Sequence, residues 1–273
     1  GLGILLIEDV PNLMFLRENL LQSIKEFAEL PENIKNKYVH DKSNYSVGWS
    51  HGKEKMKKGN ADYKKGSFYA NPIQDIITTD HNLKEEKPEI YSDNIWPEEV
   101  PNVEVFFKQT SKLLVDIGYQ VTKLLDEYLV KITDGKHNSN FFYNLLKKSS
   151  TYKGRLLHYF PYKSEDVTSI DSSCGWHLDH GCITILLSPL FFNLSGEKEM
   201  FMDSGLIIKT DKGIDVPIDI PENSIAIQLG ETIQFLSGGY LRATPHCVQS
   251  CNRKNVSREQ FALFMDCNPT TIF

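Results

Sequence analysis

His177 and Asp179 are the first residues in this chain whose types and spacing could do chemistry. They lie in the segment Gly175-Trp-His-Leu-Asp-His-Gly181. If this segment is a β-strand, positions i and i+2 point to the same side, so the imidazole and the carboxylate face a common point. Two histidines and one carboxylate on one face of a metal suit non-heme Fe(II), because the opposite positions stay open. A His-x-Asp triplet alone is far more often a surface or turn pair than a metal site, so a third ligand is needed.

His246 is the downstream histidine that can complete this set. It lies in Arg242-Ala-Thr-Pro-His-Cys-Val248, at the start of another predicted strand and 69 residues after His177. Each histidine would bind the metal as a neutral imidazole, and Asp179 would offset part of the positive charge. The three residues therefore predict an iron site. His180, one residue beyond Asp179, is expected to point away from it.

Arg258 follows His246 by twelve residues and directly precedes an apolar strand, with Gln260 two residues later on the same face. The planar guanidinium group of arginine can hold a carboxylate through two parallel hydrogen bonds. A surface salt bridge is the alternative for an isolated arginine. In company with the three metal-site residues, Arg258 and Gln260 predict an anion-binding position beside the metal.

The elements that must position these residues are short strands in the second half of the chain. β-type runs there are separated by Gly, Pro, Asn and Asp, a pattern typical of a sandwich or a small barrel. The predicted strands are Arg155–Phe160, Trp176–Leu187, Gly205–Lys209, Ile214–Ile218, Ser224–Leu229, Thr232–Leu236, Ala243–Gln249 and Gln260–Met265.

The first half is predicted to be mostly helical. After a short strand at Ile4–Ile7, apolar residues spaced by three or four predict amphipathic helices over Leu13–Pro31 and Val103–Tyr128. The segment Tyr38–Asp75 contains Lys, Gly, Ser, Asn and aromatic residues and reads as a long loop, which either covers a pocket or is plain surface. We expect these helices to pack outside a β core, giving a mainly β, α+β fold.

Composition excludes several classes of protein. The chain is 40% hydrophobic and 24% charged, as in ordinary globular proteins. Its 36 acidic and 30 basic residues are mixed without a basic stripe, which argues against nucleic acid as a partner. No apolar run approaches the roughly 18 residues that a bilayer requires, which argues against a membrane.

The five cysteines form no Cys-x-x-Cys pair, and an odd number cannot all be bridged within the chain. Reduced thiols in an intracellular, cytoplasmic setting are therefore expected. The chain opens on Gly1 and enters a strand almost at once, so we expect a segment upstream of it. We also expect a monomer.

Taken in order, these motifs resemble the Fe(II)/2-oxoglutarate oxygenases of the isopenicillin N synthase-like group, and most closely a eukaryotic branch with the motif Gly-Trp-His-x-Asp-His-Gly. Asn94-Ile-Trp-Pro97 with Pro101 matches the turn before that family's long helix. Arg155–Pro161 resembles the strand before the first ligand, and Pro221–Val248 resembles the run into the second histidine. The resemblance covers nearly the whole chain. It implies one oxygenase domain over 1–273, with a mostly helical part at 1–150 and a double-stranded β-helix, or jelly roll, at 151–273.

The resemblance also implies a reaction and its cofactors. His177, Asp179 and His246 match the Fe(II) ligands, and Arg258 matches the arginine that holds the distal carboxylate of 2-oxoglutarate. The implied enzyme is a dioxygenase that uses O2, with ascorbate as an accessory reductant, to oxidise a small organic substrate, for example by hydroxylation. It releases succinate and carbon dioxide. An iron-dependent oxidase that does not use 2-oxoglutarate is one alternative, and an inactive metal-binding or interaction protein of the same fold is another.

Two positions depart from the family pattern. Relatives often have Tyr directly before the proline that matches Pro161, and its hydroxyl helps to bind the cosubstrate, whereas this chain has Phe160. Tyr159, His158 or water would then take that role, and Gln260 stands where Ser or Thr is common. The candidates for a substrate pocket or its lid, with simple packing as the alternative for each, are Trp176, His180, Cys182, Tyr45, Trp49, Phe68, Tyr69 and Asn71.

Overall fold

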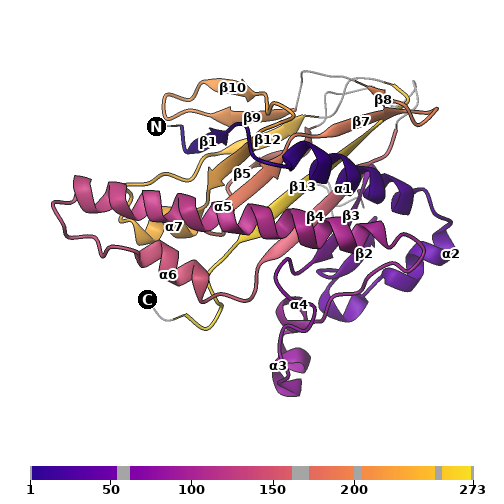
Figure 1. Ribbon diagram of the computed structural model, residues 1–273, viewed down its shortest axis with the longest axis horizontal. Coiled ribbons are helices and arrows are strands. Elements are labelled where there is room, and N and C mark those ends of the chain that lie inside the picture. The colour runs from indigo at the N-terminus through magenta and orange to yellow at the C-terminus, as the bar shows by residue number, and fades with distance from the viewer. Residues whose placement is uncertain (1, 54–61, 162–171, 200–204, 250–253, 272–273) are drawn as a thin grey trace.

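The computed structural model describes residues 2–53, 62–161, 172–199, 205–249 and 254–271. Two antiparallel sheets face each other, and two long helices lie across the outer side of the larger sheet (Figure 1). This arrangement confirms the predicted α+β fold with a double-stranded β-helix core. Within the described ranges, no helix combines the length and the hydropathy that a membrane-spanning segment needs.

The larger sheet contains nine of the described strands. Seven form a continuous path in the order β1 (Ile4–Ile7), β11 (Ile225–Leu229), β6 (Ile183–Leu187), β13 (Val256–Met265), β4 (Lys153–Tyr159), β3 (Lys65–Ala70) and β2 (Gly48–His51). The remaining two are β7 (Leu190–Asn193), which pairs with β13, and β8 (Lys198–Glu199), which pairs with β7. The smaller sheet has the order β10 (Asp215–Ile218), β9 (Leu206–Lys209), β12 (His246–Gln249) and β5 (Ser172–His177).

The helices come mostly from the first half of the chain. They are α1 (Leu13–Ala28), α2 (Glu32–Lys35), α3 (His81–Glu86), α4 (Pro88–Tyr91), α5 (Asn102–Ile132), α6 (Phe141–Lys147) and α7 (Glu231–Leu236), with short 3-10 turns η1 (Asn36–Tyr38) and η2 (Asp41–Ser43). The predictions for α1 and α5 are confirmed, because their apolar stripes pack against each other and against β13.

Strand β13 joins the helical layer to the interior of the sandwich. Its residues alternate between two faces, so Phe261, Leu263 and Met265 point to the helices and lie in the main hydrophobic core. The Phe261 ring meets Phe107 of α5 edge to face, with 5.3 Å between ring centroids. Gly118 of α5 lies so close that an added Cβ would be 2.4 Å from the Met265 sulfur, so a larger residue would require the Met265 side chain to move.

Some predicted elements differ from the structure. The run Trp176–Leu187 is two strands, β5 and β6, which belong to different sheets. The run Thr232–Leu236 was wrong as a strand because it lies in helix α7, where the backbone N–H groups of Glu231 and Thr232 bond to carbonyls of the turn after β5. Ile233 is the one buried residue of this helix. The apolar residues of the helix resemble a strand in the sequence, but they do not form one.

The segment Tyr38–Asp75 is also more ordered than predicted. It contributes β2 and β3 to the larger sheet, and β1 adds a third strand from the first half. Trp49 and Phe68 are cross-strand partners on these strands and pack against Phe27 of α1, with ring centroids 5.3 and 5.5 Å away. The expectation of helices packed outside a β core therefore holds for α1 and α5, but not for the whole first half.

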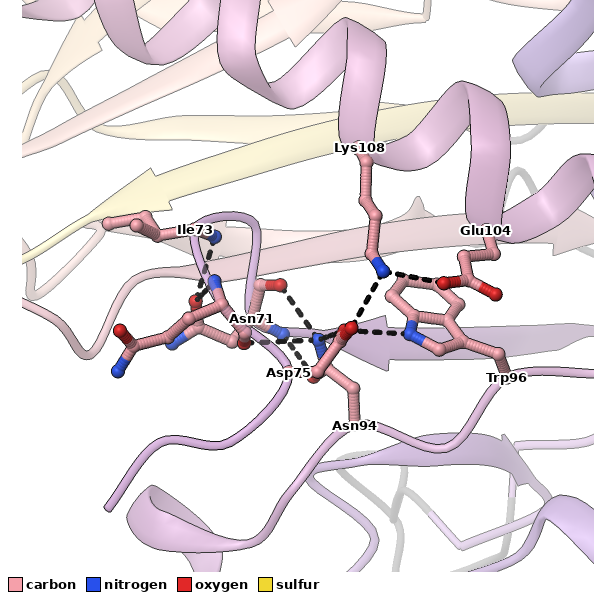
Figure 2. Close-up of polar contacts among 8 residues, drawn as sticks. Asn71, Ile73, Asp75, Asn94, Trp96, Glu104 and Lys108 are labelled. Atoms are coloured by element: carbon pink, nitrogen blue, oxygen red, sulfur yellow. Dashed lines mark hydrogen bonds and ion pairs between the residues drawn. The ribbon is translucent and has the colours of Figure 1, made fainter. Parts of the chain in front are cut away.

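A polar cluster around Asp75 ties the loop after β3 to helix α5 (Figure 2). The Asp75 carboxylate accepts hydrogen bonds from Lys108 Nζ at 2.6 Å, Trp96 Nε1 at 2.8 Å and Asn94 Nδ2 at 3.0 Å. Lys108 also donates to Glu104 at 2.5 Å. Burial acts to raise the pKa of Asp75, but the hydrogen bonds from Lys108, Trp96 and Asn94 outweigh it and hold the pKa below its usual value.

We predict that Asp75→Ala lowers the free energy of unfolding by about 1–3 kcal/mol, because it removes the shared acceptor of one charged and two neutral donors. Urea unfolding followed by circular dichroism measures this change. The pKa of Asp75 in the folded protein lies below the ordinary value of 3.8. The stabilisation by Asp75 is therefore fully present above pH 3.8 and is lost as the pH falls through the folded pKa. The gap between wild type and variant should therefore narrow in acid.

Glu104→Ala is the matched control, because it removes a carboxylate from Lys108 but leaves the loop contacts of Asp75 intact. It should cost no more than about 0.5 kcal/mol, as expected of an exposed ion pair. Equal losses in the two variants would show that the Lys108 ion pair, rather than the Asp75 tether, carries the effect.

Candidate active site

Three side chains converge between the two sheets at the ends of β5 and β12. His177 ends β5, His246 begins β12, and the two are direct partners across these antiparallel strands. Asp179 lies in the turn after β5. Its Oδ1 is 3.6 Å from His177 Nε2 and 3.8 Å from His246 Nε2. The predicted set is thus brought together, with one ligand atom from each residue within 4.8 Å of the others.

Backbone carbonyls orient both imidazoles toward this point. His177 Nδ1 lies 2.7 Å from the Gly175 carbonyl, and His246 Nδ1 lies 3.0 Å from the Thr244 carbonyl. A carbonyl can only accept, so each Nδ1 carries the proton and donates it. In the neutral form of each imidazole, Nε2 then carries the lone pair facing Asp179, the tautomer that a metal-binding histidine uses.

Asp179 is held by a neighbouring hydroxyl. Thr184 Oγ1 donates to Asp179 Oδ2 at 2.6 Å, so Oδ1 is the oxygen that remains directed at the two histidines. Two neutral imidazoles and one carboxylate on a single side match the donor set and the open geometry that non-heme Fe(II) takes. The residues of this chain therefore fit the metal.

The two histidines differ in their electrostatics. The Cys174 thiol, 3.7 Å from His177 Nδ1, raises the pKa of His177 to about 9. Burial lowers the pKa of His246, although Asp179 acts in the opposite direction. His246 is consequently neutral near pH 7, and binding of a cation at His177 must displace a proton.

A cavity enclosing about 680 Å³, part of it open to solvent, surrounds this cluster. The larger sheet supplies most of its wall, and the smaller sheet supplies the metal-facing side. The lining residues are Lys65, Arg155, Leu157, Tyr159, Cys174, His177, Asp179, Thr184, Leu186, Leu206, Ile220, Gln228, His246, Val248, Arg258, Gln260, Ala262 and Phe264.

Arg258, Gln260 and Tyr159 meet on one wall of the cavity, as expected of a cosubstrate subsite. Arg258 is 5% exposed, and its Nη2 donates to Gln260 Oε1 at 3.0 Å. Gln260 Nε2 in turn donates to the Leu187 carbonyl at 2.6 Å. Tyr159 is the cross-strand partner of Arg258, and its ring centroid lies 5.2 Å from the guanidinium carbon.

His158 does not join this wall. Strand β4 alternates, so His158 points to the opposite face, where its Nδ1 lies 3.2 Å from Glu259 Oε1. Phe160 packs its ring on His51 and His158, at 4.8 and 4.5 Å. Of the two side chains expected to replace the hydroxyl missing from Phe160, Tyr159 lines the cavity and His158 does not.

Several residues expected at a pocket or lid lie elsewhere. Trp49, Phe68 and Cys182 are buried in the hydrophobic core. Asn71 shapes the loop after β3, donating to the Ser150 carbonyl and accepting from the backbone of Ile73 and Gln74. Their roles are corrected from pocket to packing and loop structure. Trp49 and Phe68 were candidates for a lid because the sequence predicts a loop over Tyr38–Asp75, where the structure has strands β2 and β3.

The other four pocket candidates lie outside the cavity lining. Trp176 is 39% exposed and lies under Lys209, whose Nζ is 4.4 Å from the ring centroid. His180 is exposed and its Nδ1 is 2.6 Å from Glu231. The Tyr45 and Tyr69 rings are half-buried beneath the cationic groups of Lys53 and Arg155, respectively.

Sequence reasoning missed four polar lining residues: Lys65, Arg155, Thr184 and Gln228. Arg155 could have been found, because it shares a strand face with Tyr159 at the i, i+4 spacing. Lys65 required the unpredicted β3. Thr184 and Gln228 lie in apolar runs, so only the pairing of β6 with β11 shows that they face the same cavity.

Comparisons with known proteins agree with this geometry. Residues 153–266 match the family model described as the 2OG-Fe(II) oxygenase superfamily. The chain is 28% identical over 169 residues to the 2-oxoglutarate-dependent dioxygenase tropC of Talaromyces stipitatus, a match that covers 60% of this chain and 46% of that protein. The chain thus spans about half the length of this relative.

Two further similarities extend over most of the chain. A Dictyostelium discoideum protein described as an iron/ascorbate oxidoreductase is 24% identical over 270 residues, covering 93% of this chain and 69% of its own length. The crystal structure of a 2OG-Fe(II) oxygenase family protein from Caulobacter crescentus superposes with a TM-score of 0.75 at 23% identity, covering 97% of this chain and 78% of that one. The second half of the chain thus matches the 2OG-Fe(II) oxygenase family model, and the whole chain shares the fold of the Caulobacter crescentus protein.

Proposed function

We propose that this protein is an Fe(II)- and 2-oxoglutarate-dependent dioxygenase that oxidises a small organic substrate. The observation that carries the proposal is the convergence of His177, Asp179 and His246 in the same cavity as the buried Arg258. The name of the Talaromyces stipitatus relative supports the use of 2-oxoglutarate. The name of the Dictyostelium discoideum relative supports iron and ascorbate.

Each wall of the cavity has a separate task in this reaction. Iron, with O2 and 2-oxoglutarate, supplies oxidising power that converts the cosubstrate to succinate and carbon dioxide. Arg258 provides the planar donor pair for the distal carboxylate, and Tyr159 places a hydroxyl beside it. Leu157, Leu186 and Phe264 keep water from the reacting centre. Thr184 donates to Asp179 Oδ2, which keeps the other oxygen, Oδ1, directed at the metal position.

The finer assignment forms part of the same proposal. The motif from Gly175 to Gly181 supports the isopenicillin N synthase-like branch. Strands β1, β2 and β3 lie in the same sheet as β13, the strand that carries Arg258, which supports one oxygenase domain over 1–273. A monomer in a reducing cytoplasmic compartment stays a prediction, and the compartment is supported by the free thiols of Cys174, Cys182, Cys247 and Cys267.

The first test is direct. Anaerobic addition of Fe(II) and 2-oxoglutarate to the wild-type protein should produce a weak charge-transfer absorption near about 500 nm, because both occupy one octahedral centre. Asp179→Ala removes a ligand and should abolish the band, whereas Asp211→Ala, an exposed aspartate in the turn between β9 and β10, should retain it. An iron-loaded wild-type protein without the band would contradict the use of 2-oxoglutarate and favour an oxidase that dispenses with it.

Arg258→Ala should weaken 2-oxoglutarate binding by about 10- to 100-fold, because hydrogen bonds to a charged group contribute about 1.5–3 kcal/mol. Titrating the absorption band with 2-oxoglutarate measures this, and iron affinity should stay within about threefold. Arg258→Lys should be intermediate, since lysine keeps the charge but loses the planar donor pair. Arg155→Ala is the matched control in the same cavity, and an equal effect there would move the anchor to Arg155.

Thr184→Val should lower Fe(II) affinity by about 10- to 100-fold, as expected when the partner that orients a metal ligand is removed. The change keeps the shape of the side chain and removes only the hydroxyl that bonds to Asp179. Competition with a chromogenic chelator measures the affinity. Thr184→Ser should restore it, and a failure of serine to do so would indicate a packing effect instead.

A further inference from the structure

Two glutamines line the cavity, and only one of them has its hydrogen bonds satisfied. Gln260 donates to the Leu187 carbonyl and accepts from Arg258. Gln228 is 1% exposed, yet neither its Nε2 nor its Oε1 has a partner among the described residues. A buried amide without partners loses its hydrogen bonds to water and gains none in return, so it destabilises the fold. Such a group suggests a missing ligand.

The cross-strand neighbours of Gln228 offer no donor to its Oε1. In the larger sheet it lies between Ile4 of β1 and Thr184 of β6, its direct cross-strand partners. Ile4 offers an apolar side chain, and the hydroxyl proton of Thr184 is committed to Asp179. Because cross-strand partners point to the same face, Gln228 lies on the cavity side next to the residue that supports the metal ligand.

Apart from Thr184, the wall around Gln228 is apolar. Leu206 and Ile220 pack together on Ala226, two residues before Gln228 on the same face of β11, and both line the cavity. Two strands, β6 and β13, separate the Gln228 strand from Tyr159 on β4. Gln228 is thus the single described amide on an apolar wall, away from the arginine that would anchor the cosubstrate.

The chemistry of the amide distinguishes the ligands that could satisfy it. Nε2 is a donor and can be satisfied by any acceptor, but Oε1 requires an N–H or O–H group. Near pH 7, 2-oxoglutarate has two carboxylates and a ketone, so it only accepts. O2, succinate and carbon dioxide carry no donor either. Once the cosubstrate is in place, the donor must come from another molecule.

We propose that Gln228 binds the primary substrate, an inference that rests on the proposed function. The substrate would present an N–H or O–H donor beside an acceptor, as in a hydroxyl, a carboxamide or a lactam. The Gln228 amide would bind this group while Leu206 and Ile220 contact an apolar body. Gln228 would thereby determine which substrates are oriented beside the metal.

The first arm of the test compares the two glutamines. Methionine has nearly the shape of glutamine but lacks its hydrogen bonds, so Gln228→Met should raise the melting temperature of the ligand-free protein. Gln260→Met is the matched control and should lower it, because it breaks two bonds that the structure contains. A lower melting temperature for Gln228→Met would overturn the inference, since it would mean that the amide is satisfied by water in the folded protein.

The second arm uses matched small probes. The probes are added to the anaerobic protein loaded with Fe(II) and 2-oxoglutarate. We expect 2-pyrrolidinone to bind about tenfold more tightly than N-methyl-2-pyrrolidinone, or cyclohexanol to bind about tenfold more tightly than its methyl ether. In each pair the second probe has lost one hydrogen-bond donor. Shifts of the absorption band near about 500 nm report binding. Gln228→Met should lose the preference. No preference in the wild type, or an equal preference in Gln228→Met, would overturn the inference.

This design separates the two levels of the proposal. The absorption band of the wild type without any probe tests iron and 2-oxoglutarate binding alone. If that band fails to appear, the proposed function fails. If the band appears in both wild type and Gln228→Met and neither probe pair is distinguished, only the role of Gln228 fails.

Discussion

The pairing of β5 with β12 is the constraint on which the site depends. This register places His177 directly opposite His246, with their ring centroids 4.2 Å apart. A shift of one residue would turn one imidazole to the other face of the sheet and abolish the cluster. Two imidazoles so close together repel each other if both are protonated, whereas a cation between their Nε2 atoms and the Asp179 carboxylate turns the same arrangement into an attraction.

The larger sheet, which faces this pair of strands, is anchored to the helical layer through β13. Strand β13 directs Phe261, Leu263 and Met265 into the core beneath α1 and α5, while its other face directs Arg258 and Gln260 into the cavity. One strand therefore carries both the packing that stabilises the domain and the charge that would hold the cosubstrate. Part of the cost of burying Arg258 is offset by the hydrogen bond to Gln260 and by the Tyr159 ring.

The sequence was sufficient for residues whose chemistry is local or whose spacing is regular. His177, Asp179, His246 and Arg258 could be selected because each is a chemically distinctive type beside a strand-like run, and α5 was evident from its long apolar stripe. Asp179 nevertheless approaches the candidate metal position from the turn after β5, whereas the sequence predicts that it lies on a strand. The strands β2 and β3 were missed because Gly, Lys and Ser interrupt their alternation, although Trp49 and Phe68 are buried. Pairing across a sheet is a long-range property, so nothing near Gln228 in the chain shows that Thr184 lies beside it.

The arrangement of walls would separate the tasks that the proposed enzyme must combine. The candidate metal ligands lie on β5, the turn after it and β12, the arginine proposed as the anchor lies on β13, and the unsatisfied amide lies on β11. Metal and cosubstrate must be held in the same way for every substrate, so their residues are tied into hydrogen-bond networks that leave them little freedom. A substrate-selecting group has the opposite requirement, because a polar atom already satisfied by the protein has little left to offer a ligand. The difference between Gln260 and Gln228, one bonded and one not, fits this division of tasks, and the proposed substrate-binding amide lies beside Thr184, the residue that holds Asp179.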